Sequence, residues 1–179
     1  MTLALEDAIS HGMTIAYHAS QLPDSAAVIS EYGRRSFEEL NANANRLVRA
    51  LRREGIGDGD SVAIVARNRP EFIEALCAAD RSGIRFTPIN FHLKGDEIGY
   101  IVENCEAKAF IADAGLGEAS TEALSLAPKV QLALATGGDL DGFSAYADVI
   151  DAESAADIDD PSLGARMLYT SGTTGRPKV

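Results

Sequence analysis

Residues 61–89 read SVAIVARNRPEFIEALCAADRSGIRFTPI, and their pattern is the clearest indication of secondary structure in the sequence. Residues 62–66 form a short apolar run, which predicts a strand buried on both faces. Pro70 suits the first turn of a helix, apolar residues follow it at helical spacing, and Gly83 is placed to end that helix. Residues 84–89 form a second apolar run. A strand, a helix and a strand in so short a span predict a right-handed βαβ unit of a parallel sheet.

The same pattern repeats along the chain. The first four predicted strands begin 22 to 24 residues apart, which leaves room in each repeat only for a strand, a helix and two tight loops. Further helices are predicted around 98–105 and over 118–127. The five predicted strands are 62–66, 84–89, 108–112, 130–136 and 165–169. The sequence therefore predicts an α/β fold, a doubly wound and mainly parallel sheet with flanking helices.

An amphipathic helix is predicted from Ser36 onward. Ser36 and Glu39 have the spacing of a capping box, and Gly55 is placed to stop the helix. One side of the helix is apolar and the other carries four arginines, Arg46, Arg49, Arg52 and Arg53. These arginines suggest either a phosphate-binding patch or a solvated helix face. Because glutamates lie nearby, we interpret them as a solvated face.

Composition and charge exclude several classes of protein. The 179-residue chain is 46% hydrophobic and 24% charged, which is ordinary for a globular protein. Its net charge of −11 argues against binding to nucleic acid. Cys77 and Cys105 lie in apolar segments, so we interpret them as buried thiols in a reducing compartment. The sequence has no transmembrane segment and no secretion signal, and we expect a cytoplasmic protein.

Residues 139–164 differ in composition from the rest of the chain. Between Asp139 and Asp160 there are eight acidic residues and no lysine or arginine. The carboxylates lack the spacing of metal ligands, so we predict an acidic linker or surface excursion rather than a metal site.

Residues 169–178 read YTSGTTGRPK and follow a predicted strand directly. Gly172 and Gly175 allow a ligand to approach the backbone closely, and successive N–H groups in such a loop form an anion-binding concavity. Lys178 adds positive charge, and the hydroxyl groups of Ser171, Thr173 and Thr174 can turn toward phosphate oxygens or Mg²⁺. The spacing from glycine to lysine differs from that of a Walker A loop, and Pro177 has no N–H to donate. The alternatives are another kind of phosphate loop or a plain turn rich in glycine and threonine.

This ten-residue string resembles the signature phosphate loop of the adenylate-forming (AMP-binding) superfamily. That superfamily includes acyl-CoA synthetases, the adenylation domains of peptide synthetases and enzymes of the firefly-luciferase type. Further matches occur in the family's order and spacing: SFEEL at 36–40, GIGDGDSVA at 55–63, Asn68-x-Pro-Glu71, Gly83, PIN at 88–90 and EIGYI at 97–101. The residues that precede the loop are most similar to those of bacterial ligases that join fatty acids or other acyl groups to coenzyme A.

The resemblance implies an ATP-dependent acid–thiol ligase. In such an enzyme a carboxylate attacks ATP to give an acyl-adenylate and pyrophosphate, and coenzyme A then takes the acyl group. The expected substrates and cofactors are ATP, Mg²⁺, coenzyme A and a carboxylic acid, with a fatty acid favoured. The residues that would bind the β- and γ-phosphates of ATP are Thr170, Ser171, Gly172, Thr173, Thr174, Gly175 and Lys178.

The resemblance covers nearly the whole chain, but only the N-terminal portion of such an enzyme. The family's adenine and Mg²⁺ motif, ribose-binding aspartate, hinge and catalytic lysine all follow the loop, so the C-terminal domain and every catalytic residue are absent from these 179 residues. We therefore expect the chain alone to be inactive. A departure from the family's pattern is Val179, where a small residue usually follows the lysine.

Several alternatives stay open. The parent enzyme could instead be a peptide-synthetase adenylation domain or an aryl-CoA ligase. The chain itself could be a stand-alone nucleotide-binding module, or a non-catalytic fragment that binds a partner. A dinucleotide-binding loop at Gly55-x-Gly57-x-Gly59 is discounted, because it follows a helix and precedes a strand, the reverse of the Rossmann order. His11, His18 and His92 are scattered and form no catalytic or metal-ligating pattern.

Overall fold

The structure is a computed structural model that describes residues 4–170. The helices in this range are α1 (Leu5–Ser10), α2 (Thr14–Gln21), α3 (Phe37–Arg53), α4 (Pro70–Asp80), α5 (Gly95–Asn104), α6 (Glu118–Ser125) and α7 (Tyr146–Asp151), with a short 3₁₀ helix at Ala114–Leu116. The strands are β1 (Ala26–Ser30), β2 (Gly33–Ser36), β3 (Ser61–Val65), β4 (Arg85–Ile89), β5 (Ala107–Asp113), β6 (Leu132–Thr136), β7 (Ser144–Ala145) and β8 (Ala165–Arg166).

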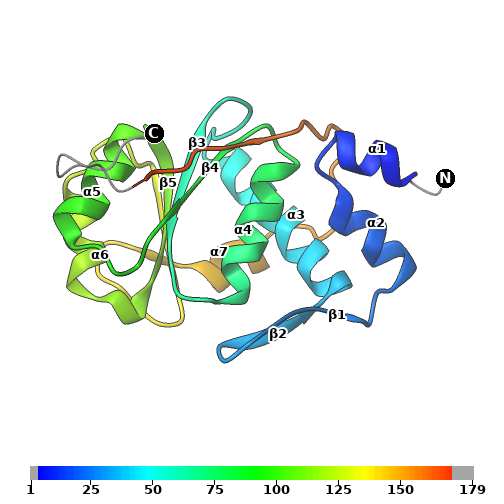
Figure 1. Cartoon of the computed structure of the whole chain (residues 1–179), viewed down its shortest axis with the longest axis horizontal. Coiled ribbons are helices and arrows are strands. Elements are labelled where there is room, and N and C mark those ends of the chain that lie inside the picture. The colour runs from blue at the N-terminus through cyan, green and yellow to red at the C-terminus, as the bar shows by residue number, and fades with distance from the viewer. Residues whose placement is uncertain (1–3, 171–179) are drawn as a thin grey trace.

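Six strands form one sheet in the order β7-β6-β5-β3-β4-β8, and every neighbouring pair in it is parallel. The first four predicted strands correspond to β3, β4, β5 and β6, with ends shifted by one or two residues. Helices cover both faces of the sheet, α5 and α6 on one side and α3, α4 and α7 on the other (Figure 1). The predicted doubly wound parallel sheet is confirmed.

Strand β3 lies in the middle of this arrangement and is buried along its whole length. Val62 and Ile64 pack in the core formed with α3 and α4, whereas Ala63 and Val65 pack in the core formed with α5 and α6. Successive side chains of a strand point to opposite faces, so a strand with both faces covered has to be apolar throughout. The uninterrupted apolar run in the sequence follows from this double burial.

The fifth predicted strand, 165–169, contracts to the two residues of β8. The amide of Met167 donates to the carbonyl of Phe86 at 2.9 Å. The backbone N–H and C=O groups of every second residue of β4, counted from Phe86, therefore point toward β8. The next residue in this alternation is Pro88, which has no N–H to donate. The ladder between β4 and β8 therefore ends at that position.

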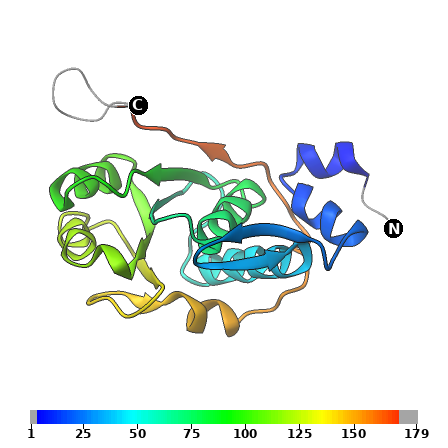
Figure 2. The same cartoon turned by 60° about the horizontal axis from the view of Figure 1, so that its bottom comes forward.

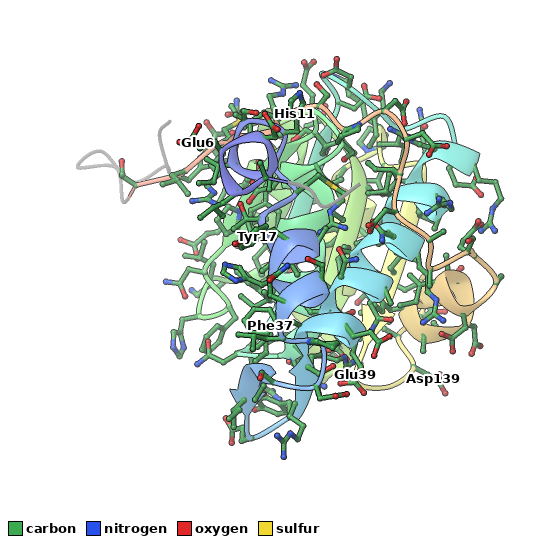
Figure 3. All side chains as sticks on the ribbon, turned by 90° about the vertical axis from the view of Figure 1, so that its right-hand side faces the viewer. Glu6, His11, Tyr17, Phe37, Glu39 and Asp139 are labelled. Carbon is green, nitrogen blue, oxygen red and sulfur yellow. The ribbon has the colours of Figure 1, made fainter. Side chains whose placement is uncertain are left out.

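The predicted start of α3 is confirmed. Ser36 Oγ accepts a hydrogen bond from the Glu39 amide at 3.2 Å, and Glu39 Oε2 accepts one from the Ser36 amide at 2.8 Å. Both donors would otherwise lack a partner at the helix N-terminus. Figure 3 shows Phe37 and Glu39 in the first turn of this helix, close to the hairpin of β1 and β2.

The antiparallel hairpin of β1 and β2 was not predicted. It forms a sheet of its own and packs against α3 and α4, outside the parallel sheet (Figure 2). Its strands are short and mostly exposed or half-buried, so they lack the apolar run that marks the parallel strands.

The arginines of α3 are exposed or half-exposed, as predicted for a solvated face, but they also contact the acidic segment, which was not predicted. Arg46, Arg52 and Arg53 form ion pairs with Asp151, Asp160 and Glu153, and Arg49 donates to backbone carbonyls of the same acidic segment. That segment also differs from a plain linker, because it contains β7 and α7, and Tyr146 and Ile150 of α7 are buried. The opposite charges of the two segments pair across the surface of the protein.

Both cysteines are buried free thiols, as the sequence indicated. Burial raises the pKa of the Cys77 thiol to about 11 and also raises the pKa of Cys105. Because the thiolate is the nucleophilic form, both groups are poor nucleophiles near neutral pH.

Candidate functional site

Most of the predicted phosphate loop lies outside the described residues. The predicted roles of Ser171, Gly172, Thr173, Thr174, Gly175 and Lys178 therefore stay predictions. Thr170 is described and exposed. The Tyr169 hydroxyl donates to Asn104 Oδ1 at 2.6 Å, and burial raises the pKa of Tyr169 to about 12. This contact holds Tyr169, at the start of the phosphate-loop sequence, against the C-terminal end of α5.

Strand β8 directs the chain toward one particular edge of the sheet. It pairs in parallel with β4, so it points the same way as β3, β4, β5 and β6, whose carboxyl ends meet at one edge. Ligands of open α/β sheets bind outside the carboxyl ends of the strands. The connections that begin at this edge are those after Val65, Ile89, Asp113 and Thr136.

A buried carboxylate organises part of this edge. Asp113, the last residue of β5, is fully buried and accepts a hydrogen bond from the Gly115 amide at 2.9 Å. Its Oδ2 lies 3.0 Å from Arg69 Nε and 4.0 Å from Arg67 Nε. A buried carboxylate needs such partners, because desolvation strongly disfavours an isolated charge. Asp113 therefore fixes the connection between β3 and α4.

Arg69 is enclosed from several sides. Besides its pair with Asp113, its guanidinium carbon lies 4.5 Å from the centre of the Tyr32 ring, a cation–π contact. Gly137 approaches so closely that a β-carbon there would collide with the guanidinium. Sequence reasoning missed this cluster. The available signal was an aspartate directly after a predicted buried strand, at the edge where functional residues gather.

A cavity of about 490 Å³ opens beside Arg69. Its walls come from β1, from the connection between β3 and α4, from α4 itself and from the end of β4, with Phe72 and Phe91 among the apolar residues. Asn68 and Asn90 supply polar groups. An apolar pocket with a few polar groups at the carboxyl edge has the character of a small-molecule site.

His11 follows α1, His18 lies in α2 and His92 follows β4. His11 Nδ1 lies 2.9 Å from the Asp7 carbonyl, and the rings of His18 and His92 pack against Phe37 and Phe91. Within residues 4–170, no group of three or more histidine, cysteine or acidic side chains could hold a metal ion. In the same range, no helix is both long and apolar enough to cross a membrane.

The segment with Gly55, Gly57 and Gly59 lies between α3 and β3. The order helix, loop, strand confirms that this segment is not a dinucleotide-binding turn, which requires a strand before the glycines and a helix after them.

Comparison with known proteins agrees with this geometry. The chain matches the AMP-binding enzyme family over residues 15–179. A fatty acid–acyl-carrier-protein ligase of Streptomyces coeruleorubidus is 28% identical over 166 residues, which are 92% of this chain and 31% of that ligase. A 3-oxocholest-4-en-26-oate–CoA ligase of Rhodococcus rhodochrous is 29% identical over 187 residues, which are 99% of this chain and 32% of that ligase.

The fold is also found among solved structures. The crystal structure of an anthranilate CoA ligase in complex with anthranoyl-AMP superimposes with a TM-score of 0.85 at 20% identity, over 94% of this chain and 33% of that one. The chain thus spans about a third of the length of the relatives it matches. The family match extends over nearly all of its residues, and so the chain belongs to the family of AMP-binding enzymes.

Proposed function

We propose that this chain is the N-terminal, phosphate-binding portion of an ATP-dependent acyl-CoA synthetase. The complete enzyme would convert a carboxylate and ATP to an acyl-adenylate and pyrophosphate, and then transfer the acyl group to coenzyme A. The observation that carries the proposal is the position of β8, which pairs in parallel with β4 and so runs toward the carboxyl edge just before the sequence YTSGTTGRPK begins. Family membership supports the adenylate-forming class.

In this proposal the loop acts by electrostatic stabilisation. The hydroxyl groups of Ser171, Thr173 and Thr174 and the backbone N–H groups around Gly172 and Gly175 bind the β- and γ-phosphates. Lys178 and Mg²⁺ neutralise the charge that develops on the departing pyrophosphate. Thr170 would bind the phosphates together with these residues. The other substrates are a carboxylic acid, with a fatty acid favoured, and coenzyme A, and the enzyme would act in the cytoplasm without nucleic acid.

The alternative functions differ from the proposed one in the carboxylic acid that is activated or in the thiol that accepts the acyl group. A peptide-synthetase adenylation domain would activate an amino acid, and an aryl-CoA ligase would activate an aromatic acid. Among the relatives, one ligase transfers fatty acids to an acyl carrier protein, so this acceptor also has to be tested against coenzyme A.

The test is carboxylate-dependent exchange of labelled pyrophosphate into ATP, made with the longer protein that carries this chain. We expect exchange with medium- or long-chain fatty acids, and release of the acyl-adenylate as a thioester on addition of coenzyme A. Exchange driven only by aromatic acids or by amino acids would replace the proposal with the corresponding alternative. Carboxylate-independent hydrolysis of ATP would exclude all three.

A further inference from the structure

The segment between α7 and β8, residues 152–164, is here called the acidic strap. It lies beside α3 and leads directly into β8 (Figure 2). Ile158 is the only buried side chain within this fully described segment. Apolar burial therefore contributes little to its placement, and polar contacts have to determine where it lies.

One set of polar contacts comes from the arginines of α3. Arg49 Nη1 donates to the carbonyls of Ser154 at 3.2 Å and Ala156 at 2.6 Å, and Arg49 Nη2 donates to the carbonyl of Asp157 at 3.2 Å. Arg52 forms an ion pair with Asp160 at 2.8 Å. These side chains are partly exposed, so each contact alone contributes modestly.

A second set passes through a buried arginine. Arg81 follows α4 directly and has no exposed surface. Its Nη1 donates to Asn41 Oδ1 at 2.8 Å and to Asn45 Oδ1 at 2.5 Å. The amide groups of both asparagines in turn donate to Asp157 Oδ1, at 2.8 and 2.9 Å. The Arg81 side chain is thus connected to the acidic strap through two asparagines.

The backbone around Arg81 contacts the acidic strap a second time. The Ser162 amide donates to the Arg81 carbonyl at 3.0 Å, and the Gly83 amide donates to the Ser162 carbonyl at 2.7 Å. Two residues later, the Gly164 amide donates to the Asp80 carbonyl at 2.9 Å. A β-carbon at Gly164 would collide with the backbone carbonyls beside it, so the chain passes close against the end of α4.

The contacts of Arg81 offset only part of the cost of burying it, because Nε donates to the Cys77 carbonyl at 3.2 Å and Nη1 to the two asparagines, whereas Nη2 has no partner among the described residues. Burial lowers the pKa of Arg81, and the charge of Asp157 is among the interactions that raise it again. A buried cation is destabilising unless its donors are satisfied. Arg81 is linked to the acidic strap at Asp157 and at Ser162, which lie five residues apart and shortly before β8.

We propose that Arg81 is a positioning residue for β8 and, through β8, for Tyr169 and Thr170 at the start of the phosphate-loop sequence. Its side chain holds Asp157 through Asn41 and Asn45, and its backbone carbonyl accepts from the Ser162 amide. Together these contacts fix the point where β8 begins to pair with β4. The direction in which Tyr169 and Thr170 leave the sheet follows from that point. The task of the loop itself rests on the proposed function, whereas the placement of β8 does not.

Amide hydrogen exchange of the 179-residue chain, measured by NMR, tests this role. Asp157→Ala removes the acceptor of both asparagines at an exposed position, so it is expected to leave the protein folded. We expect exchange to speed up about tenfold or more at the amides of Ser162, Gly164 and Ala165, with β5 unchanged. Asp157→Asn keeps an acceptor oxygen and should restore most of the protection. Asp159→Ala, the matched control, removes an exposed carboxylate of the same segment and should change nothing.

Two spectroscopic signals separate positioning from general stability. Slowly exchanging guanidinium resonances of Arg81 should be visible in the wild type and in Asp157→Asn but lost in Asp157→Ala. The NOE contacts between the Tyr169 ring and Asn104 should weaken in the same variant, because β8 is no longer held in place. Unchanged exchange at Ser162 and Gly164, or an equal rise throughout the sheet, would overturn the proposal. None of these measurements needs a nucleotide. Failure of pyrophosphate exchange would therefore contradict the proposed function of the loop, but it would not affect the conclusion that Arg81 positions β8.

Discussion

Replacing Lys178 with alanine is expected to lower acyl-adenylate formation by the complete enzyme about 10²- to 10³-fold, the range for loss of one electrostatic stabiliser of a transition state. Thr174→Ala should lower the same half-reaction. Thiolation of a supplied acyl-adenylate should stay nearly unchanged, because pyrophosphate takes no part in that step and the loop has no developing charge to stabilise there. The two half-reactions are measured separately, by pyrophosphate exchange and by thioester formation from synthetic acyl-adenylate.

Lys178→Arg serves as the matched control, because it keeps the positive charge while changing its shape. It should retain more adenylation activity than Lys178→Ala. Equal losses in both half-reactions would indicate a folding defect, and the assignment of the loop to pyrophosphate would then have no support.

Replacing Glu74 with alanine is expected to cost about 3–5 kcal/mol of folding stability. Glu74 lies on α4 and has no exposed surface. Its Oε1 accepts from Arg35 Nε at 2.7 Å and from Asn43 Nδ2 at 2.9 Å, and its Oε2 accepts from the Tyr146 hydroxyl at 2.9 Å. One carboxylate thus joins α4 to β2, α3 and α7. Its removal leaves Arg35 without its partner and Tyr146 buried without an acceptor.

Urea denaturation followed by circular dichroism measures this loss. Glu38→Ala is the matched control, because Glu38 is an exposed glutamate in the first turn of α3, and its loss should cost less than about 1 kcal/mol. Glu74→Gln keeps one acceptor oxygen and should fall between the two. A loss of less than about 1 kcal/mol for Glu74→Ala would contradict the view that this carboxylate holds the elements together.

The parts of the fold that the sequence predicted depend on short-range patterns. Strand β3 is recognisable because both of its faces are buried, and the start of α3 is recognisable because Ser36 and Glu39 satisfy each other within four residues. The length of β8 was overestimated for a physical reason. An apolar run shows that a segment is suited to a strand, but the end of the ladder depends on Pro88 of the neighbouring strand.

The contacts that the sequence did not predict join residues far apart in the chain. Arg49 and Ala156 are 107 positions apart, and Arg67 and Asp113 are 46 apart. Charge runs in two segments are compatible with solvation or with pairing, and only the folded arrangement decides between them. For the site, the motif predicted the loop, while the buried cluster around Asp113 has no motif of its own.

If these residues are the phosphate-binding part of a larger acyl-activating enzyme, as proposed, the 179-residue chain alone should bind Mg-ATP only weakly, and calorimetric titration measures this binding. Among the described residues at the carboxyl edge, Arg67 and Arg69 both lie beside Asp113, whose negative charge offsets part of theirs and weakens their attraction for a phosphate. Contact with phosphates alone should be weak, should fall steeply with added salt and should discriminate poorly between nucleotides. We therefore predict no carboxylate-dependent pyrophosphate exchange by this chain and no calorimetric binding of Mg-ATP in the micromolar range. Micromolar binding that is selective for ATP, or measurable exchange, would contradict this proposal and identify the chain as a complete nucleotide-binding module.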